Sequence, residues 1–291
     1  MILSGSITEY AHAKINLSLD ILGKRDDGYH LLKMVMQTVA LSDTLTISVK
    51  EPGYGIKTST GGNVPDDDHN LAYRAAALMK EAYGIKEGID IKIEKKIPVS
   101  AGLAGGSSDA AAVLRGIKKL FDIPVETEEL EVLGLKLGAD VPYCILGGTK
   151  LCEGTGEVIT EITPSLKPFP VLLIKPDEGV STKEAYSIYD SLTDVRRPDT
   201  EAVIGAIKKG DLSELGKSTA NVLEEAAFSK VPVIREIKEF LIDSGVSLAL
   251  MSGSGSTVFA IDEDRELLNK VGKEAGERFK DCRVLVTETR G

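Results

Sequence analysis

The sequence has no tryptophan, only three histidines and three cysteines among its 291 residues, and an aromatic content of 5%. The cysteines and the histidines are scattered, without the short spacings that hold a zinc ion or build a disulfide framework. We therefore expect no zinc site and free thiols, as in a reducing cytosol.

The sequence also lacks an excess of positive charge and long apolar runs. The formal net charge of −10 argues against nucleic acid or an anionic membrane as the main partner. It leaves a phosphorylated ligand open, because local backbone dipoles bind anions even in an acidic protein. No apolar run approaches the roughly 20 residues of a membrane span, and Met1–Ser6 lacks the features of a signal peptide. We expect a cytoplasmic protein.

The length and the patterning predict an α+β protein of two domains. Strand-like alternation covers Ser6–Ile21 and Gly88–Glu94, and Asn70 is placed to cap a helix that ends at Gly84. Three prolines between Pro164 and Pro170 mark the best boundary. The predicted domains are residues 1–163 and 164–291.

The most informative segment is rich in glycine and serine and leads into an alanine-rich helix. It reads Pro98, Val99, Ser100, Ala101, Gly102, Leu103, Ala104, Gly105, Gly106, Ser107, Ser108. Its glycines permit tight turns and close approach to a ligand, and a helix starting near the two serines would offer free N–H groups to an anion. The pattern predicts a phosphate-binding loop, although a glycine-rich turn before a core helix is the alternative.

This loop matches neither common nucleotide motif. The usual phosphate loop needs a glycine, four residues and then Gly-Lys-Ser or Gly-Lys-Thr. Gly216-Lys217-Ser218 comes nearest, but Asp211 stands where the first glycine belongs. The glycine spacing of the dinucleotide fingerprint is also absent.

Lys14 and Asn16 lie on the first predicted strand and share one face, while Ile15, Leu17 and Leu19 point to the other. The apolar face predicts a core. The polar face is either a solvated edge or a functional surface.

Three further segments carry polar residues in short loops. Gly23–His30 ends in Tyr29 and His30, Gly138–Pro142 holds the lone carboxylate Asp140, and Met251–Thr257 is rich in glycine and serine. Taken singly, each has an ordinary explanation, as a loop tip, a turn before a proline or a hairpin.

In order and spacing, these segments resemble the GHMP kinases, a family of ATP-dependent small-molecule kinases. The resemblance covers nearly the whole chain and rests on these motifs: Ala13-Lys14-Ile15-Asn16-Leu17, Asp27-Gly28-Tyr29-His30, Gly102–Ala111 and Gly138-Ala139-Asp140-Val141-Pro142. Within the family, the combination resembles members that phosphorylate an alcohol carrying a cytidine diphosphate group, in the synthesis of isoprenoid precursors. The implied fold is an N-terminal ATP-binding domain and a ferredoxin-like C-terminal domain, with the active site in the cleft between them.

The resemblance also implies roles for individual residues. Pro98–Ser108 would wrap the ATP triphosphate, Ser107 or Ser108 would help to hold Mg²⁺ or the phosphates, and Asn70 would lie near the adenine base. Lys14 and Asp140 would form the catalytic pair. Ala104, where some relatives have glycine, should be harmless if its φ stays negative.

Substrate binding is the second group of implied roles. Asn16 would fix the substrate or Lys14, and Tyr29 and His30 would hold the cytidine. Tyr186 would stack on the other face of the cytosine, although Tyr189 competes for that role.

Several alternatives remain open. The chain could be a related kinase acting on mevalonate, homoserine or a sugar, or a nucleotide-binding sensor without activity. The Tyr29–His30 pair favours a substrate with a base, and the presence of both Lys14 and Asp140 favours an enzyme. Asp140 serves either as a general base or as a group that positions the hydroxyl. A monomer and a homodimer are equally compatible with the sequence.

Overall fold

The computed structural model describes residues 5–61 and 64–291, so most of the Met1–Ser6 stretch lies outside the described residues. The chain divides into two compact units. Unit 1 comprises the residues up to Ala13, Leu41–Val99 and Ala104–Gly147, and unit 2 comprises Lys14–Ala40, Ser100–Leu103 and Gly148–Gly291. The predicted boundary at residues 163/164 stays a prediction.

Two long strands, β1 (Ser6–Lys24) and β2 (His30–Lys50), pair with each other and contribute to both units. The second half of β2 pairs with β4 in unit 1, and its first half pairs with β5 in unit 2. The alternation predicted for Ser6–Ile21 is thus confirmed as a strand, and the strand continues three residues further.

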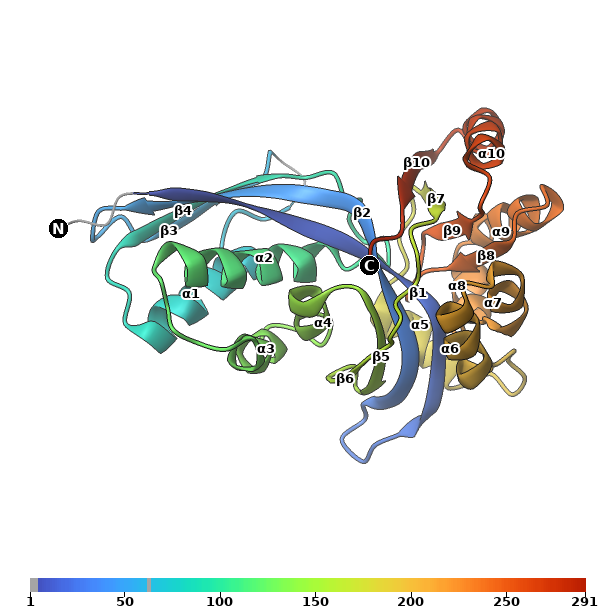
Figure 1. Cartoon of the computed structure of the whole chain (residues 1–291), viewed down its shortest axis with the longest axis horizontal. Helices are drawn as coiled ribbons and strands as arrows, with labels where there is room; N and C mark the ends of the chain where they lie inside the picture. The colour runs from blue at the N-terminus through green and yellow to red at the C-terminus, as the bar shows by residue number, and fades with distance from the viewer. Residues whose placement is uncertain (1–4, 62–63) are drawn as a thin grey trace. The chain divides into compact units, whose positions relative to one another are not determined.

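In unit 1, the helices pack against one face of the sheet (Figure 1). Figure 1 shows α1 and α2 side by side along β3 and β4. The elements are β3 (Ile56–Ser59), α1 (Leu71–Tyr83), β4 (Gly88–Glu94), α2 (Gly105–Leu120), α3 (Thr127–Leu135) and α4 (Val141–Leu146).

The caps of α1 confirm the sequence prediction. The Asn70 side chain accepts a hydrogen bond from the amide of Ala72, and Gly84 ends the helix in the left-handed conformation that glycine adopts without strain. β4 also has the predicted bounds, and Ile89, Ile91 and Ile93 face the core.

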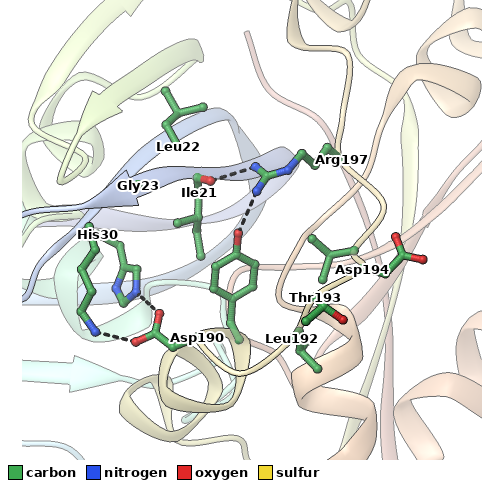
Figure 2. A pocket seen from close by; sticks show the side chains of 12 residues that line it. Ile21, Leu22, Gly23, His30, Asp190, Leu192, Thr193, Asp194 and Arg197 are labelled. Atoms are coloured by element: carbon green, nitrogen blue, oxygen red, sulfur yellow. Dashed lines mark hydrogen bonds and ion pairs between the residues drawn. The ribbon is translucent and has the colours of Figure 1, made fainter.

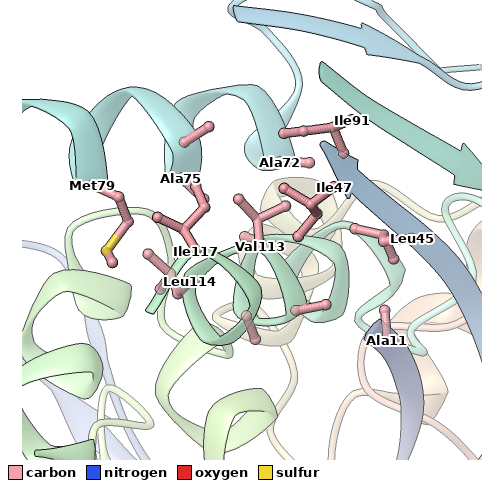
Figure 3. Close-up of a cluster of buried hydrophobic side chains, with 14 of the residues drawn as sticks. Ala11, Leu45, Ile47, Ala72, Ala75, Met79, Ile91, Val113, Leu114 and Ile117 are labelled. Atoms are coloured by element: carbon pink, nitrogen blue, oxygen red, sulfur yellow. The ribbon is translucent and has the colours of Figure 1, made fainter. Parts of the chain in front are cut away.

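The core of unit 1 is a single apolar cluster. Val113, Leu114 and Ile117 of α2 pack against Ala75 and Met79 of α1 and against aliphatic side chains of the sheet (Figure 3). Ala110, Leu114 and Ile117 form an apolar stripe along one face of α2, and all three are fully buried.

Unit 2 contains a four-stranded antiparallel sheet in the order β10-β7-β9-β8. Numbering these strands one to four along the chain gives the order 4-1-3-2, and helical segments join the first to the second and the third to the fourth. This is the ferredoxin-like topology, and it confirms the predicted fold class. The elements are β5 (Thr149–Gly154), β6 (Val158–Glu161), β7 (Pro170–Pro176), α5 (Thr182–Tyr189), α6 (Thr200–Lys209), α7 (Leu212–Ser218), α8 (Glu224–Lys230), α9 (Val233–Asp243), β8 (Leu248–Met251), β9 (Val258–Ile261), α10 (Arg265–Arg278) and β10 (Cys282–Glu288).

In the described part of the chain, no helix combines the length and the apolar character needed to cross a membrane.

The α2 stripe allows a direct test of this core. Leu114→Ala should lower the free energy of unfolding by about 2–5 kcal/mol, because it leaves a cavity among fully buried side chains. Val132→Ala, at a position that is 64% exposed, should change it by less than about 0.5 kcal/mol. Urea unfolding measures both, and equal effects of the two substitutions would contradict this packing.

Candidate active site

The backbone of the glycine-rich segment alternates in conformation. Ser100, Gly102 and Ala104 have φ angles of 50°, 71° and 56°. Backbone that alternates between right- and left-handed residues is the conformation in which successive N–H groups form anion-binding concavities in proteins. The prediction of an anion-binding loop therefore gains a specific backbone geometry.

The helix that follows begins earlier than predicted. α2 starts at Gly105 with Ala104 as its N-cap, two residues before Ser107. Ala104 was expected to be harmless if its φ angle stayed negative. That condition is not met, because the φ angle of Ala104 is 56°. An alanine Cβ is crowded in this conformation, so the loop holds a residue under local strain.

Gly102 is required by close packing within unit 2. A Cβ at this position would lie 2.1 Å from the carbonyl oxygen of Ser252. The hydroxyl of Ser252 donates to the Gly102 carbonyl at 2.9 Å. The glycine-rich segment and the Met251–Thr257 turn, predicted separately, are thus in direct contact at this residue.

The structure distinguishes the two serines of the loop. Ser108 is 1% exposed, and its hydroxyl donates to the His12 carbonyl at 2.6 Å. Ser107 is half-buried, and its Oγ lies 4.0 Å from where a Cβ on Gly138 would sit, near the loop that carries Asp140. Ser107 is therefore better placed than Ser108 to offer its hydroxyl to a ligand.

Asp140 is the N-cap residue of the short helix α4, and its side chain makes no capping hydrogen bond. Its backbone carbonyl accepts from the amide of Cys144 at 3.0 Å. The residue is half-buried in unit 1. The sequence predicted a short loop around Asp140, and the structure places this residue at the start of a helix.

Lys14 and Asn16 are buried, so the solvated-edge alternative is wrong. Lys14 is 4% exposed and Asn16 is 0% exposed. The Lys14 ammonium donates to Oδ1 of Asn16 at 2.7 Å and to the carbonyl of Gly102 at 3.0 Å. Unit 2 thus brings Lys14, its predicted partner Asn16 and the glycine-rich segment together.

The Met251–Thr257 turn is held by a residue that the sequence analysis missed. The side-chain Nδ2 of Asn221 donates hydrogen bonds to the backbone carbonyls of Met251 and Gly253, at 2.8 and 2.7 Å. A Cβ on Gly253 would lie 3.3 Å from the ammonium nitrogen of Lys14. Asn221 therefore fixes the backbone that borders Lys14.

His30 and Tyr186 are brought together in unit 2. Their rings stack with centroids 4.8 Å apart, whereas Tyr189 approaches His30 edge-on at 6.4 Å. His30 Nε2 contacts Asp190 at 2.6 Å, and the Asp190 carboxylate also binds Lys24. Hydrogen bonds from Lys24 and His30 hold the pKa of Asp190 below its usual value. Tyr29, the other predicted residue, is 65% exposed.

A pocket of about 500 Å³ opens beside His30 (Figure 2). Tyr189 lines it, and its hydroxyl contacts the Arg197 guanidinium at 3.2 Å. The remaining wall mixes apolar side chains such as Ile21 and Leu192 with the charged side chains of Lys24 and Asp190. This volume falls in the range of small-molecule sites.

A buried charged cluster beneath the glycine-rich segment was also missed. Lys95 Nζ lies 2.5 Å from Asp43 and 2.7 Å from Asp109. Burial raises the pKa of Asp109 to about 7, against the lowering effect of Lys95. Burial opposes the charge on Lys95, but the two carboxylates outweigh it and raise its pKa. No short-range pattern in the sequence indicates this long-range cluster.

The predicted site residues fall in both units. Unit 1 holds Asn70, Pro98, Val99, Ala104–Ser108 and Asp140, and unit 2 holds Lys14, Asn16, Tyr29, His30, Ser100–Leu103 and Tyr186. The pairing of Lys14 with Asp140 stays a prediction. So does the role of Asn70 near the base, and both ends of its side-chain amide are engaged, by Ala72 and Pro65.

Comparisons with known proteins identify the class. The family model for the GHMP kinases N-terminal domain matches residues 70–148, and the model for the C-terminal domain matches residues 203–281. The chain belongs to the GHMP kinase family.

Curated relatives in this family carry a more specific name. A protein of Clostridium kluyveri (strain NBRC 12016) is 50% identical over 96% of this chain and 98% of its own. One from Clostridium botulinum (strain Alaska E43 / Type E3) is 48% identical with the same coverage. Both are named 4-diphosphocytidyl-2-C-methyl-D-erythritol kinase.

Solved structures agree with this family. A crystal structure of 4-(cytidine 5'-diphospho)-2C-methyl-D-erythritol kinase superposes with a TM-score of 0.82 at 32% identity, over 98% of this chain and 100% of that one. A homoserine kinase from Cytophaga hutchinsonii matches with a TM-score of 0.78 at 22% identity, over 98% and 94% of the two chains. The second match shows the fold alone.

Ala104→Gly should stabilise the protein by about 0.5–1 kcal/mol. Glycine relieves a left-handed strain of about 1–2 kcal/mol, partly offset by its greater freedom in the unfolded chain, about 0.4–1 kcal/mol. Ala139→Gly is the control, because Ala139 is exposed and is not among the residues of positive φ. It should destabilise. Thermal unfolding decides, and a loss of stability in Ala104→Gly would contradict the strain at this residue.

Proposed function

We propose that this chain is an ATP-dependent kinase that phosphorylates the 2-hydroxyl of 4-diphosphocytidyl-2-C-methyl-D-erythritol, in the non-mevalonate pathway of isoprenoid precursor synthesis. One structural observation supports the enzymatic role above the others: a buried lysine, Lys14, is bonded to the glycine-rich segment through Gly102. The names of near-full-length relatives at 48–50% identity support the substrate.

ATP would bind with its triphosphate along Pro98–Ser108. The left-handed residues of this segment and the first turn of α2 supply N–H groups without a basic side chain, which suits an acidic protein. Ser107 fits a role as Mg²⁺ ligand, because this ion prefers oxygen donors and the Ser107 hydroxyl is not buried like that of Ser108. Bound Mg²⁺ would offset the negative charge of the phosphates.

The chemical step needs positioning and charge stabilisation more than covalent chemistry. The hydroxyl oxygen of the substrate attacks the γ-phosphorus of ATP. The bond between the γ-phosphorus and the β–γ bridging oxygen breaks, and ADP leaves. Asp140 would accept the hydroxyl proton or hold the hydroxyl in place. Lys14 would stabilise negative charge on the transferred phosphoryl group. Asn16 orients the Lys14 ammonium through the bond at 2.7 Å.

The cytidine would bind at the His30 region of unit 2. Tyr29 is exposed there, and Tyr186 is already stacked on the imidazole. Tyr189 meets the same imidazole edge-on, so its ring is not parallel to the stacked pair of His30 and Tyr186. We therefore assign the cytosine-stacking role to Tyr186 together with Tyr29, and hydrogen bonding to His30.

Homoserine and mevalonate kinases share the fold, but their similarity to this chain at 13–22% identity carries no substrate with it. A non-catalytic nucleotide sensor would have no need for a buried lysine at the phosphate loop. These two alternatives are separated from the proposal by assay.

The direct test is a coupled ADP-release assay with ATP, Mg²⁺ and the cytidine-bearing alcohol, beside the same alcohol without its cytidine. The proposal predicts turnover that falls sharply when the cytidine is missing. A folded protein that binds ATP and phosphorylates neither alcohol would overturn the substrate, and equal rates on both would overturn the cytidine site.

Asp140→Asn should lower kcat by about 10²–10⁴-fold, the usual contribution of a positioned acid or base. The KM for ATP should stay within a few-fold. Asp243→Asn, at an exposed position at the end of α9, serves as control and should behave as wild type. A loss near the upper limit, with the acidic limb of the kcat–pH profile removed, indicates a general base, and a small loss indicates positioning. Wild-type kcat in Asp140→Asn excludes both roles.

Tyr186→Ala should raise the KM for the cytidine-bearing alcohol about 5–150-fold, since stacking on a base contributes about 1–3 kcal/mol. Tyr189→Ala should have a smaller effect, and neither variant should change the KM for ATP. Steady-state kinetics with each substrate varied in turn makes the comparison. A larger effect at Tyr189 would reverse the assignment.

A further inference from the structure

The Asp43–Lys95–Asp109 cluster joins three elements of unit 1. Asp43 belongs to β2, Lys95 follows the last residue of β4, and Asp109 lies in the second turn of α2. Asp43 is 0% exposed, Asp109 is 2% exposed, and the side chain of Lys95 is 15% exposed. The cluster takes no direct part in the chemistry described above.

The residues of the cluster flank the glycine-rich segment in the sequence. Lys95, Lys96 and Ile97 lead directly into Pro98, where the glycine-rich segment begins, and Asp109 follows Ser108, where the segment ends. Asp43 Oδ1 accepts hydrogen bonds from the amides of Lys96 and Ile97, the latter at 2.8 Å. Lys95 then connects Asp43 to Asp109. One ammonium group therefore ties together the two ends of the segment.

Lys95 also lies close to the start of α2. A Cβ on Gly105 would be 3.6 Å from the Lys95 ammonium and 3.1 Å from Cγ2 of Ile97. The first residue of the helix thus rests directly on the connection from β4. A shift of Lys95 would disturb the helix terminus that offers its amides to the phosphates.

Stability alone is a poor explanation for this arrangement. Burying ions is costly, and apolar residues of similar volume often replace a buried ion pair without loss. Here one ammonium faces two carboxylates, and Oδ1 of Asp109 is buried without a hydrogen-bond partner. The segment between the tied ends holds two non-glycine residues of positive φ, Ser100 and Ala104, and such strain persists only where the surroundings enforce it.

We propose that Lys95 is a positioning residue for nucleotide binding: by bridging Asp43 and Asp109 it holds both ends of residues 98–108 so that the loop keeps its phosphate-binding conformation. Without the tie, the loop relaxes in the free protein, and ATP must restore its conformation on binding. Removing Lys95 should therefore weaken the binding of ATP and leave the affinity for the alcohol unchanged. This inference rests on the proposed role of the loop in ATP binding.

The test compares Asp109→Ala with Asp109→Asn. Alanine removes the acceptor for Lys95 and leaves the Lys95–Asp43 pair in place, whereas asparagine keeps an acceptor oxygen. Asp109→Ala should raise the Kd for MgATP, measured by calorimetry without the alcohol, by at least about tenfold, a change of about 1.4 kcal/mol. Its KM for ATP should rise equally, with kcat and the KM for the alcohol within about threefold of wild type. Asp109→Asn should restore most of the affinity.

Lys95→Met and Lys92→Met form a second, matched pair. Both remove a lysine ammonium at or next to β4, but the Lys92 side chain is 66% exposed and pairs with Glu94. Lys95→Met should weaken MgATP binding like Asp109→Ala, and Lys92→Met should leave it unchanged. If Lys95→Met does not fold, the two Asp109 variants still decide.

The outcomes are distinguishable. Folded Asp109→Ala with wild-type affinity for MgATP overturns the inference. So does an equal loss in the KM for both substrates and in kcat, which indicates general damage to the fold. A wild-type protein that binds no MgATP overturns the proposed function instead, and one that binds MgATP without phosphorylating the alcohol still allows the calorimetric comparison.

Discussion

The conformation of the glycine-rich segment is the constraint on which the rest of the site depends. Its residues at 100, 102 and 104 all have left-handed φ angles, and only the middle one is glycine. In the proposed function, this backbone geometry gives an acidic chain an anion site without a cluster of basic side chains. The surrounding contacts must supply the energy that keeps Ser100 and Ala104 in this conformation.

Those contacts are polar and buried in both units. In unit 2, the Gly102 carbonyl accepts from the ammonium of Lys14 and from the hydroxyl of Ser252. In unit 1, the charged cluster around Lys95 holds the ends of the segment. The Gly102 carbonyl also holds the Lys14 ammonium, so the conformation of the proposed nucleotide-binding loop and the orientation of the proposed catalytic lysine are linked through Gly102.

The sequence predicted those features that depend on local patterns. Alternation located β4, and Asn70 and Gly84 located both ends of α1, because cap chemistry acts within a few residues. The start of α2 was misjudged because the left-handed Ala104 contradicts the intrinsic preference of alanine. The burial of Lys14, the cluster of Asp43, Lys95 and Asp109, and the role of Asn221 depend on residues distant in the chain, which no periodicity reveals. The roles of Lys14 and Asp140 came from family resemblance.

The central claim, that backbone amides of residues 98–108 hold the triphosphate, is tested most directly by a crystal structure with Mg²⁺ and a non-hydrolysable ATP analogue. The account predicts phosphate oxygens within hydrogen-bond distance of amides in this segment and at the first turn of α2, with Ser100 and Ala104 still at positive φ. A triphosphate bound elsewhere, or held chiefly by lysine and arginine side chains while this loop makes no contact, would contradict it.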